Sequence, residues 1–296
     1  AQNHSRLIGI VLKRRKDKYE NIFTDPFHGE LLGALESAIR EQGYYMMIYI
    51  SEDIEEIVRN IVGWNTEGLI LIGMLHDDYL KIRSKYKKPA VLIDSYTPKN
   101  IARYVNIGLD DEEGGYLMTK YLLDCGHRKI AFLADNMEGV DYIRYTGHQR
   151  ALQEYGLDID LDNLIVIRPS KYERQGNMEE IYAVAHKFTA FMCCSDYYAV
   201  TLMKYLKAKG IRFPEDLSIT GFDDNLYAQL ACPSLTTIHQ DIFQRGTIAA
   251  EYLFKMIDGW NPKTTNLSLP VRLVVRDSVK ILNPPEDDSS DDGSAL

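Results

Sequence analysis

The chain has 296 residues, and its 34 Lys and Arg against 43 Asp and Glu give a formal net charge of −9 at pH 7. Apolar residues make up 45% of it and charged residues 26%, a balance typical of folded globular proteins that excludes wholesale disorder. No apolar run approaches the roughly 18 residues of a membrane-spanning helix. The acidic balance argues against this chain binding nucleic acid by itself, because phosphate contacts need a basic surface.

Short apolar runs alternate with amphipathic stretches in the first part of the chain. The run LIGIVL at 7–12 is continuously apolar, which is typical of a strand buried on both faces. The stretch after Asp25 and Pro26 repeats apolar residues at helical spacing and stops at Gly43, so it predicts a capped helix. The same reasoning predicts strands at 44–50, 68–73, 89–94 and 104–110, and helices at 53–62, 77–86 and 111–125.

The alternation restarts near residue 126. Strands are predicted at 127–135, 164–168, 189–194 and 217–224, and helices at 144–155, 175–187 and 196–209. A segment at 235–241 crosses back, a long helix follows over 241–258, and a last strand is predicted at 269–275. Because parallel strands need crossover connections, this order predicts an α/β fold with two doubly wound parallel-sheet subdomains. An eight-stranded barrel is the alternative, but it needs neither the restart nor the late crossing segment.

The cysteines and the chain ends indicate a compartment. Cys125, Cys193, Cys194 and Cys232 form no CxxC pair and lack the spacing of metal ligands, so we expect free, reduced thiols with a packing role. No signal peptide is visible at the N-terminus, and we expect a cytoplasmic protein. The segment 284–296 carries five carboxylates and one leucine, and we expect a disordered acidic tail.

A basic loop lies between the first strand and the first helix. Lys13, Arg14, Arg15, Lys16 and Lys18 cluster there. They could steer an anionic ligand, or they could form an ordinary solvated loop, and the sequence favours the second interpretation.

Several strings occur together in an order that indicates a family. They are GLILIG at 68–73, PAVLID at 89–94, LDDEEGG at 109–115, GHRKIAFLAD at 126–135, RYTGHQRAL at 144–152, FPEDLSITGFDD at 213–224, PSLTTIHQD at 233–241 and LPVRLVVRDSV at 269–279. With these strings the chain resembles the effector-binding core of the lactose/galactose repressor family of bacterial transcription regulators, whose fold is similar to that of the periplasmic sugar-binding proteins. The resemblance covers about residues 6–280.

The resemblance implies two α/β subdomains joined by three crossover segments, with a ligand cleft between them. The first subdomain would comprise 6–125 plus 238–265, and the second 126–237 plus 266–283. A DNA-binding head, expected as a helix-turn-helix module preceding Leu7, is absent from this chain. Ligands of open α/β sheets lie at the carboxyl ends of the strands, where both subdomains would face the cleft.

Two side chains are the main ligand-binding candidates that the resemblance implies. Arg144 opens an R-x-x-G motif, and its planar guanidinium can clamp hydroxyls, a carboxylate or a phosphate. A surface ion pair is the alternative for Arg144. Asp223 ends a predicted strand and could accept bonds from two sugar hydroxyls. The alternative is that it caps the following helix, although Asp224 fits that role better.

Further candidates surround these two. Asp196 could be a helix N-cap, a ligand contact or both, and Ser195 stands where the family commonly has Asn. Phe27 could stack on a sugar or belong to the core, and His28 could donate to an effector or be solvated. Asp94 and Ser95 close a strand of the first subdomain and would line the cleft, although Asp94 could equally be a structural strand-end carboxylate. Tyr172 lies near an aromatic position of the family's cleft.

These observations predict a sensor rather than an enzyme. We find no GxSxG, Walker, HExxH or dinucleotide-binding motif, and we expect no catalysis, no cofactor and no metal. The predicted function is effector sensing and homodimerisation in a transcription regulator, of the repressor type by resemblance, which reaches operator DNA only through the missing head. The effector would be a sugar or related small metabolite. The alternative is an extracellular or periplasmic sugar-binding protein of a transport system.

Overall fold

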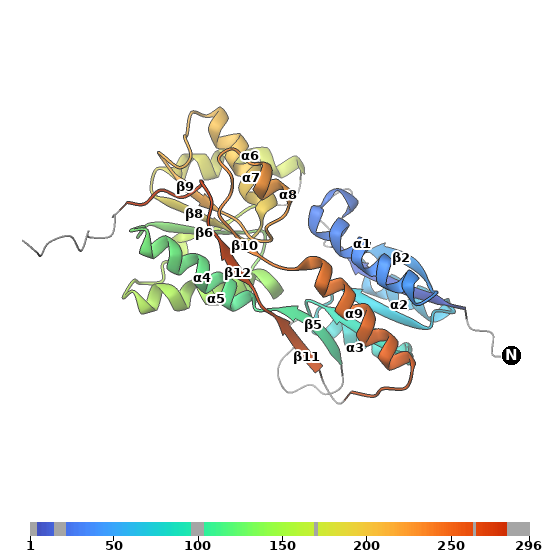
Figure 1. The fold of residues 1–296 in the computed structure, drawn as a ribbon. Helices are drawn as coiled ribbons and strands as arrows, with labels where there is room; N and C mark the ends of the chain where they lie inside the picture. The colour runs from blue at the N-terminus through green and yellow to red at the C-terminus, as the bar shows by residue number, and fades with distance from the viewer. Residues whose placement is uncertain (1–4, 15–21, 96–103, 169–170, 263–264, 283–296) are drawn as a thin grey trace, which may run out of the picture.

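The computed structural model describes residues 5–14, 22–95, 104–168, 171–262 and 265–282, which form two lobes (Figure 1). The first lobe is built on a six-stranded sheet in the order β11-β5-β4-β3-β1-β2, and every pairing in it is parallel. Its strands are β1 (Leu7–Lys13), β2 (Tyr45–Ser51), β3 (Gly68–Ile72), β4 (Ala90–Ile93), β5 (Val105–Leu109) and β11 (Thr265–Leu269). A short 3-10 turn, η1 (Ile22–Thr24), precedes the first helix.

Helices cover both faces of this sheet, because its central strands alternate their side chains between two apolar layers. On one face, Ile8, Ile10 and Leu12 pack in the layer beneath α1 (Pro26–Glu41) and α9 (Ile242–Ile257). On the other face, Val11, Leu69 and Leu71 pack in the layer beneath α2 (Ile54–Gly63) and α3 (His76–Lys85). A strand buried on both sides explains why the run at 7–12 is apolar throughout.

The second lobe repeats the plan on a smaller sheet, with the parallel order β7-β6-β8-β9. Its strands are β6 (Ile130–Ala134), β7 (Leu164–Val166), β8 (Ala190–Cys193) and β9 (Ser218–Thr220), and an antiparallel pair, β10 (Thr237–His239) and β12 (Arg272–Val274), adjoins them through bridges from β10 to the β9 region. Its helices are α4 (Asp111–Asp124), α5 (Gly139–Glu154), α6 (Lys171–Ala185), α7 (Asp196–Ala208) and α8 (Leu226–Leu230), and a 3-10 turn, η2 (Leu161–Asn163), leads into β7.

The chain passes between the lobes three times. It crosses between β5 and α4, between β10 and α9, and between β11 and β12 (Figure 1). The first and third crossings are bonded to each other: the amide of Asp110 donates to the Leu269 carbonyl at 2.9 Å, and the Ser268 hydroxyl donates to Asp110 Oδ1 at 2.7 Å. Three crossovers between two α/β lobes are the arrangement that the family resemblance implies.

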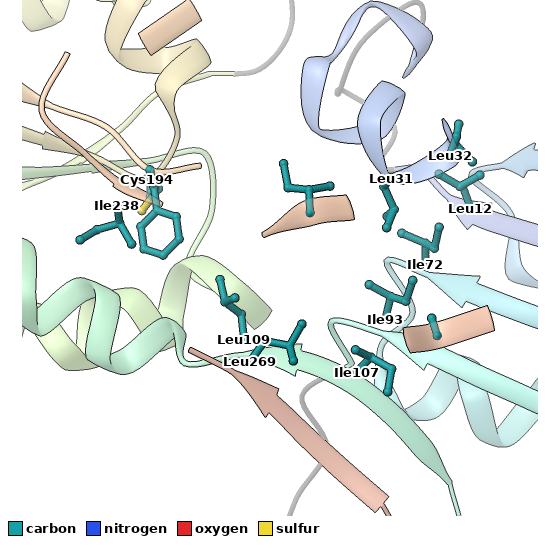
Figure 2. Packing of buried hydrophobic residues seen from close by; sticks show 14 of the residues in the cluster. Leu12, Leu31, Leu32, Ile72, Ile93, Ile107, Leu109, Cys194, Ile238 and Leu269 are labelled. Atoms are coloured by element: carbon teal, nitrogen blue, oxygen red, sulfur yellow. The ribbon is translucent and has the colours of Figure 1, made fainter. Parts of the chain in front are cut away.

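One apolar cluster continues from the first lobe through these crossings into the second. Figure 2 shows Leu31 and Leu32 of α1 beside strand residues of the first sheet, while Cys194 and Ile238 lie in the second lobe. Leu109 and Leu269, at the ends of β5 and β11, belong to the same cluster and lie between the two groups. The lobes are therefore joined by packed apolar side chains as well as by the backbone.

Two elements lie in the lobe opposite to the predicted one. The helix at 111–125, expected in the first subdomain, is α4, which packs on α5 and contacts β8, β10 and β12 of the second lobe. The strand β11, missed in the sequence and placed within 266–283 of the second subdomain, pairs in register with β5 of the first sheet. The residues of β11 alternate between at least partly buried and exposed, and its sequence TNLSL lacks an apolar run, which is why the strand was not predicted.

Other differences are local. Helix α5 begins at Gly139 rather than near residue 144, and it starts without a side-chain cap, so the sequence carried no start signal. Helix α6 begins at Lys171 rather than near residue 175, and the short α8 was not predicted. The two separate open sheets exclude the barrel alternative. All four cysteines are free, and only Cys232 is exposed.

Two segments discussed in the sequence analysis lie wholly or partly outside the described residues. The predicted acidic tail at 284–296 lies outside the described residues. In the basic loop, residues 15–18 lie outside them too, while Lys13 and Arg14 form ion pairs with Asp78 at 2.6 Å and Glu52 at 2.5 Å. Among the described residues, no helix is both long and apolar enough to cross a bilayer.

Candidate functional site

The carboxyl ends of strands in both sheets carry the predicted polar residues. Asp94 follows β4 of the first lobe directly, whereas Asp223 follows β9 of the second by three residues. Both have a positive φ, 56° for Asp94 and 121° for Asp223, which is uncommon for a residue with a side chain. These two carboxylates, with Asp111, Arg144, Gln240 and Arg245, are connected by hydrogen bonds and close charges, and we refer to the six residues as the inter-lobe cluster.

Arg144 lies on α5 and is buried rather than part of a surface ion pair. Its Nε donates to Asp111 Oδ1 at 2.8 Å and its Nη1 donates to the Cys194 carbonyl at 2.5 Å. The guanidinium also lies 3.5 Å from the centre of the Phe222 ring, a cation–π distance. Burial alone would lower the pKa of Arg144, but the carboxylates of Asp111 and Asp223 outweigh it and raise the pKa. Arg144 is therefore charged and held in one orientation.

Two glycines bring Arg144 and Asp111 together by letting α4 and α5 cross in backbone contact. A Cβ on Gly115 would lie 2.0 Å from the Arg144 carbonyl oxygen, and a Cβ on Gly147 would lie 1.9 Å from that of Glu112. Neither distance is possible for a real side chain. The Gly of the R-x-x-G motif is thus required by helix packing, which in turn sets the position of the arginine three residues earlier.

Asp223 is almost fully buried, yet only one of its carboxylate oxygens is bonded to the protein. Gln240 Nε2 donates to Oδ1 at 2.5 Å, and Oδ2 has no hydrogen-bond partner within the described part of the chain. Burial raises the pKa of Asp223 to about 7, against the opposing effect of Arg144 and with a further increase from Asp25. This carboxylate is short of hydrogen-bond donors and can accept one from a bound molecule.

The first lobe contributes Arg245, which the sequence motifs did not indicate. Its side chain is 1% exposed, and Nη2 donates to Asp94 Oδ1 at 2.6 Å. Its Nη1 donates to Gln240 Oε1 at 2.8 Å. Arg245 occupies the apolar stripe of α9, between Ile242 and Ala249. A charged residue on the buried face of an amphipathic helix is a detectable signal, and it could have indicated this position from the sequence.

The N-terminus of α1 contributes three more side chains. Asp25 caps the helix, accepting from the Phe27 amide at 3.1 Å, as the sequence predicted. Its other oxygen lies 2.6 Å from His28 Nδ1. Both Phe27 and His28 are half-buried, and the Arg245 guanidinium lies 5.5 Å from the Phe27 ring centre. Phe27 packs against the core cluster while remaining partly exposed.

Asp196 and Ser195 are engaged by the protein itself. Asp196 is fully buried, and its two oxygens accept from the Thr237 hydroxyl at 2.6 Å and the Asn225 amide at 2.9 Å. Ser195 caps α7, accepting from the Tyr198 amide at 3.3 Å. Asp196 is therefore not the N-cap of α7, and its two oxygens instead fix Asn225 and Thr237 in place. Burial and then the nearby Asp223 raise the pKa of Asp196 well above its usual range.

The cap of α8 corrects an expectation about Asp223 and Asp224. Neither of them caps this helix, because Asn225 does so by accepting from the Tyr227 amide at 2.9 Å. Asp224 instead pairs with Arg276 and with His239. Asp223 therefore has no capping role that would explain its buried position.

The structure gives less information about the two remaining candidates, Ser95 and Tyr172. Ser95 is buried, and its hydroxyl has no hydrogen-bond partner in the described part of the chain. Tyr172 is the second residue of α6, but its side chain lies outside the described residues. No group of three or more His, Cys, Asp or Glu among the described residues is placed to hold a metal ion.

Comparisons with known proteins agree with this architecture. Residues 119–279 match the family profile of the periplasmic binding protein-like domain. The chain is 30% identical over 297 residues to the HTH-type transcriptional repressor PurR of Vibrio vulnificus, covering 95% of this chain and 83% of that one. It is 29% identical over 310 residues to the arabinose metabolism transcriptional repressor of Geobacillus stearothermophilus, covering 94% and 78%.

Solved structures show the same fold. A LacI family regulator from Enterococcus faecium with bound ribose superposes with a TM-score of 0.78 at 25% identity, covering 94% of this chain and 100% of that one. The CelR–cellobiose complex superposes with a TM-score of 0.82 at 24% identity, covering 93% and 85%. The motifs, the two-lobe fold with three crossovers and these relatives lead to one conclusion: this chain belongs to the lactose/galactose repressor (LacI/GalR) family of bacterial transcription regulators.

Proposed function

We propose that the chain binds a sugar or related small metabolite in a cleft between its two lobes and passes the resulting movement to a DNA-reading head. The observation that carries this proposal is Asp223, a nearly buried carboxylate at the carboxyl end of a sheet whose Oδ2 has no partner among the described residues. Oδ2 is not among the fully enclosed side-chain atoms that lack a partner, so it keeps some accessible surface, and a ligand hydroxyl can reach it and donate a hydrogen bond.

The chemistry of the proposed site suits a ligand rich in hydroxyls. Asp223 accepts from a hydroxyl, and Arg144, held by Asp111, presents a guanidinium of fixed orientation. The ring of Phe27 offers an apolar face on which a sugar can stack. His28, Asp94, Ser95 and Tyr172 are proposed as further contacts. Asp196 acts mainly by holding the loop that carries Asp223, through its bonds to the Asn225 amide and the Thr237 hydroxyl, and Ser195 acts mainly as the cap of α7.

The three crossovers provide the route for the signal. Closure around a ligand would rotate one lobe against the other about these segments, and in a two-fold dimer this would change the separation of two attached helix-turn-helix heads. Effector affinity and operator affinity are then reciprocally coupled. One structural neighbour, the lac repressor dimer bound to operator and to the anti-inducer ONPF, is an assembly of this kind.

The relatives favour regulation over transport or catalysis. The relatives described above are transcriptional repressors, which supports a non-enzymatic regulator in place of a secreted binding protein. The free cysteines are compatible with the reducing cytoplasm, where we propose that the protein acts.

A thermal-shift screen tests effector binding. Monosaccharides, oligosaccharides, sugar phosphates and purines are added singly, and a true effector raises the melting temperature because it binds only the folded form. Asp223→Asn keeps the shape of the side chain and should abolish that rise. Asp216→Asn is the matched control, because Asp216 precedes β9 at its opposite end and pairs with Arg212 on the surface. If Asp223→Asn retains the full rise, the proposed site is misplaced.

Sedimentation tests the assembly. We expect a species of twice the 33.9 kDa of one chain. A strict monomer at high concentration would contradict the dimeric regulator and support the transport alternative.

A further inference from the structure

A continuous chain of hydrogen bonds joins the two lobes through the middle crossover. It runs from Asp94 of the first lobe to Arg245 at 2.6 Å, from Arg245 to Gln240 at 2.8 Å, and from Gln240 to Asp223 of the second lobe at 2.5 Å. Gln240 itself lies in the crossing segment between β10 and α9. Gln240, Arg245 and Asp223 are each more than nine-tenths buried.

The direction of every bond in this chain is fixed by chemistry. A guanidinium has only donors, so the oxygen of the Gln240 amide must face Arg245 and its NH₂ group must face Asp223. A flip of the amide would place two donors against each other and two acceptors against each other. Arg245 therefore decides which end of Gln240 meets Asp223, and Gln240 decides which Asp223 oxygen is left free.

Burying the charged side chain of Arg245 at its position costs free energy. It lies on the apolar stripe of α9, and its Nε is buried without a hydrogen-bond partner in the described part of the chain. An apolar side chain would pack there without that cost, and replacing buried ion pairs by apolar residues is often neutral or stabilising. Stability of the first lobe therefore does not explain why an arginine occupies this site.

We propose that Arg245 is a positioning residue that, acting through Gln240, lets the first lobe set the orientation and proton affinity of Asp223 in the second. The importance of this for sensing rests on the proposed function, in which Asp223 contacts the effector. Movement of the first lobe pulls on Arg245, breaks or strengthens the Gln240 bond, and so changes the affinity of Asp223 for a donor. Closure and effector recognition are thereby coupled through three side chains.

Several other charged groups face Asp223 and also influence its pKa, so their contributions must be distinguished from that of Arg245 acting through Gln240. Arg144 of α5 and Arg245 of α9 lower its pKa, as does the bond from Gln240, while Asp25 before α1 raises it. Asp196 of α7 interacts electrostatically with it as well. Asp224 is its neighbour in the chain. Only the Gln240 bond connects Asp223 to Arg245 through a shared hydrogen-bond partner among the described residues.

The test is a carboxyl-carbon NMR titration of Asp223 in the effector-free chain, labelled at aspartate and assigned with Asp223→Asn. We expect Gln240→Met, which removes the connection and no charge, to raise the pKa of Asp223 by about one unit. Arg245→Met combined with Asp94→Asn, which leaves no unpaired buried charge, should raise it similarly. Asp94→Asn alone shows the effect of removing that carboxylate, and Lys255→Met, exposed on the same helix, should change nothing.

Non-additivity is the decisive readout. If Arg245 acts through Gln240, adding the Asp94→Asn and Arg245→Met pair to Gln240→Met should raise the pKa by clearly less than the sum of the separate changes. Additive shifts would show that Arg245 acts only through space, and an unchanged pKa in folded Gln240→Met would show that no connection exists; either result overturns the proposal. If the Arg245 variant does not fold, Gln240→Met and Arg245→Lys still decide it. The titration uses no effector, so its outcome is independent of whether the proposed function holds.

Discussion

Arg144 and Asp111 form an ion pair that solvent hardly reaches, with 2.8 Å between Nε and Oδ1 and side chains that are 7% and 0% exposed. Because a buried pair is costly to break from one side, we expect Asp111→Asn to lower the free energy of unfolding by about 3 kcal/mol. Urea denaturation measures this. Glu112→Gln, which loosens an exposed pair with Arg150 on the adjacent residue, should cost less than about 1 kcal/mol. Equal losses in the two variants would show that Arg144 is held by other contacts.

The crossing of α4 and α5 depends on the absence of a side chain at Gly147. We expect Gly147→Ala to force the helices apart and lower the free energy of unfolding by about 2 kcal/mol or more, because the new methyl group would meet the Glu112 carbonyl at 1.9 Å. Gly33→Ala on α1 is the control. A Cβ there meets nothing within 4 Å, so helix propensity should make this variant neutral or more stable by up to about 1 kcal/mol. A harmless Gly147→Ala would refute the close helix contact.

The raised pKa of Asp223 predicts a pH dependence with a definite sign. The folded-state pKa of about 7 lies above the unfolded value near 3.8, so the folded state holds the proton more tightly. The stability that this proton confers is complete below about pH 4 and is lost as the pH rises through about 7. Asp223→Asn mimics the protonated form, so it should gain stability relative to the wild type between about pH 5 and about pH 8.

Urea unfolding at those two pH values checks this, with Asp216→Asn as the control. The pKa of Asp216 is lowered to about 2 by Arg212, so this group does not titrate in that window. If the Asp223→Asn and wild-type stabilities change in parallel with pH, Asp223 is ionised throughout.

His148 predicts the opposite trend at lower pH. It is buried between α4 and α5, with Nδ1 2.9 Å from the Thr119 hydroxyl, and burial lowers its pKa to about 3. Protonation therefore favours the unfolded chain, and stability is lost as the pH falls from 6.5 through about 3. His148→Gln can keep a donor for Thr119 and should lose less stability than the wild type at about pH 4.5. His186→Gln, at an exposed position, is the control and should lose as much stability as the wild type, and an identical loss in all three chains would contradict a neutral buried His148.

The sequence predicted most strands and helices because their apolar patterns are strong and local. It did not predict which lobe each element joins at the crossings: the helix at 111–125 follows its strand as any crossover helix would, and nothing local shows that it packs with α5. The strand β11 was missed since TNLSL is half polar. Sequence motifs pointed to Arg144 and Asp223, whereas their partners Asp111 and Gln240 lay in family-like strings without an assigned role, and Arg245 was detectable only as a charge on an apolar stripe.

The pairing of β11 with β5 has a consequence for synthesis on the ribosome. Residues 265–269 complete a sheet whose other strands end at residue 109, and α9 covers one face of that sheet. The first lobe therefore has an open strand edge and an uncovered apolar face while the elements of the second lobe from α4 to β10 are being made. The second lobe is interrupted in the same way until β12 emerges. Long-range pairings of this kind slow folding and leave intermediates prone to aggregation, so we expect the nascent chain to need protection until β11 and β12 have been made.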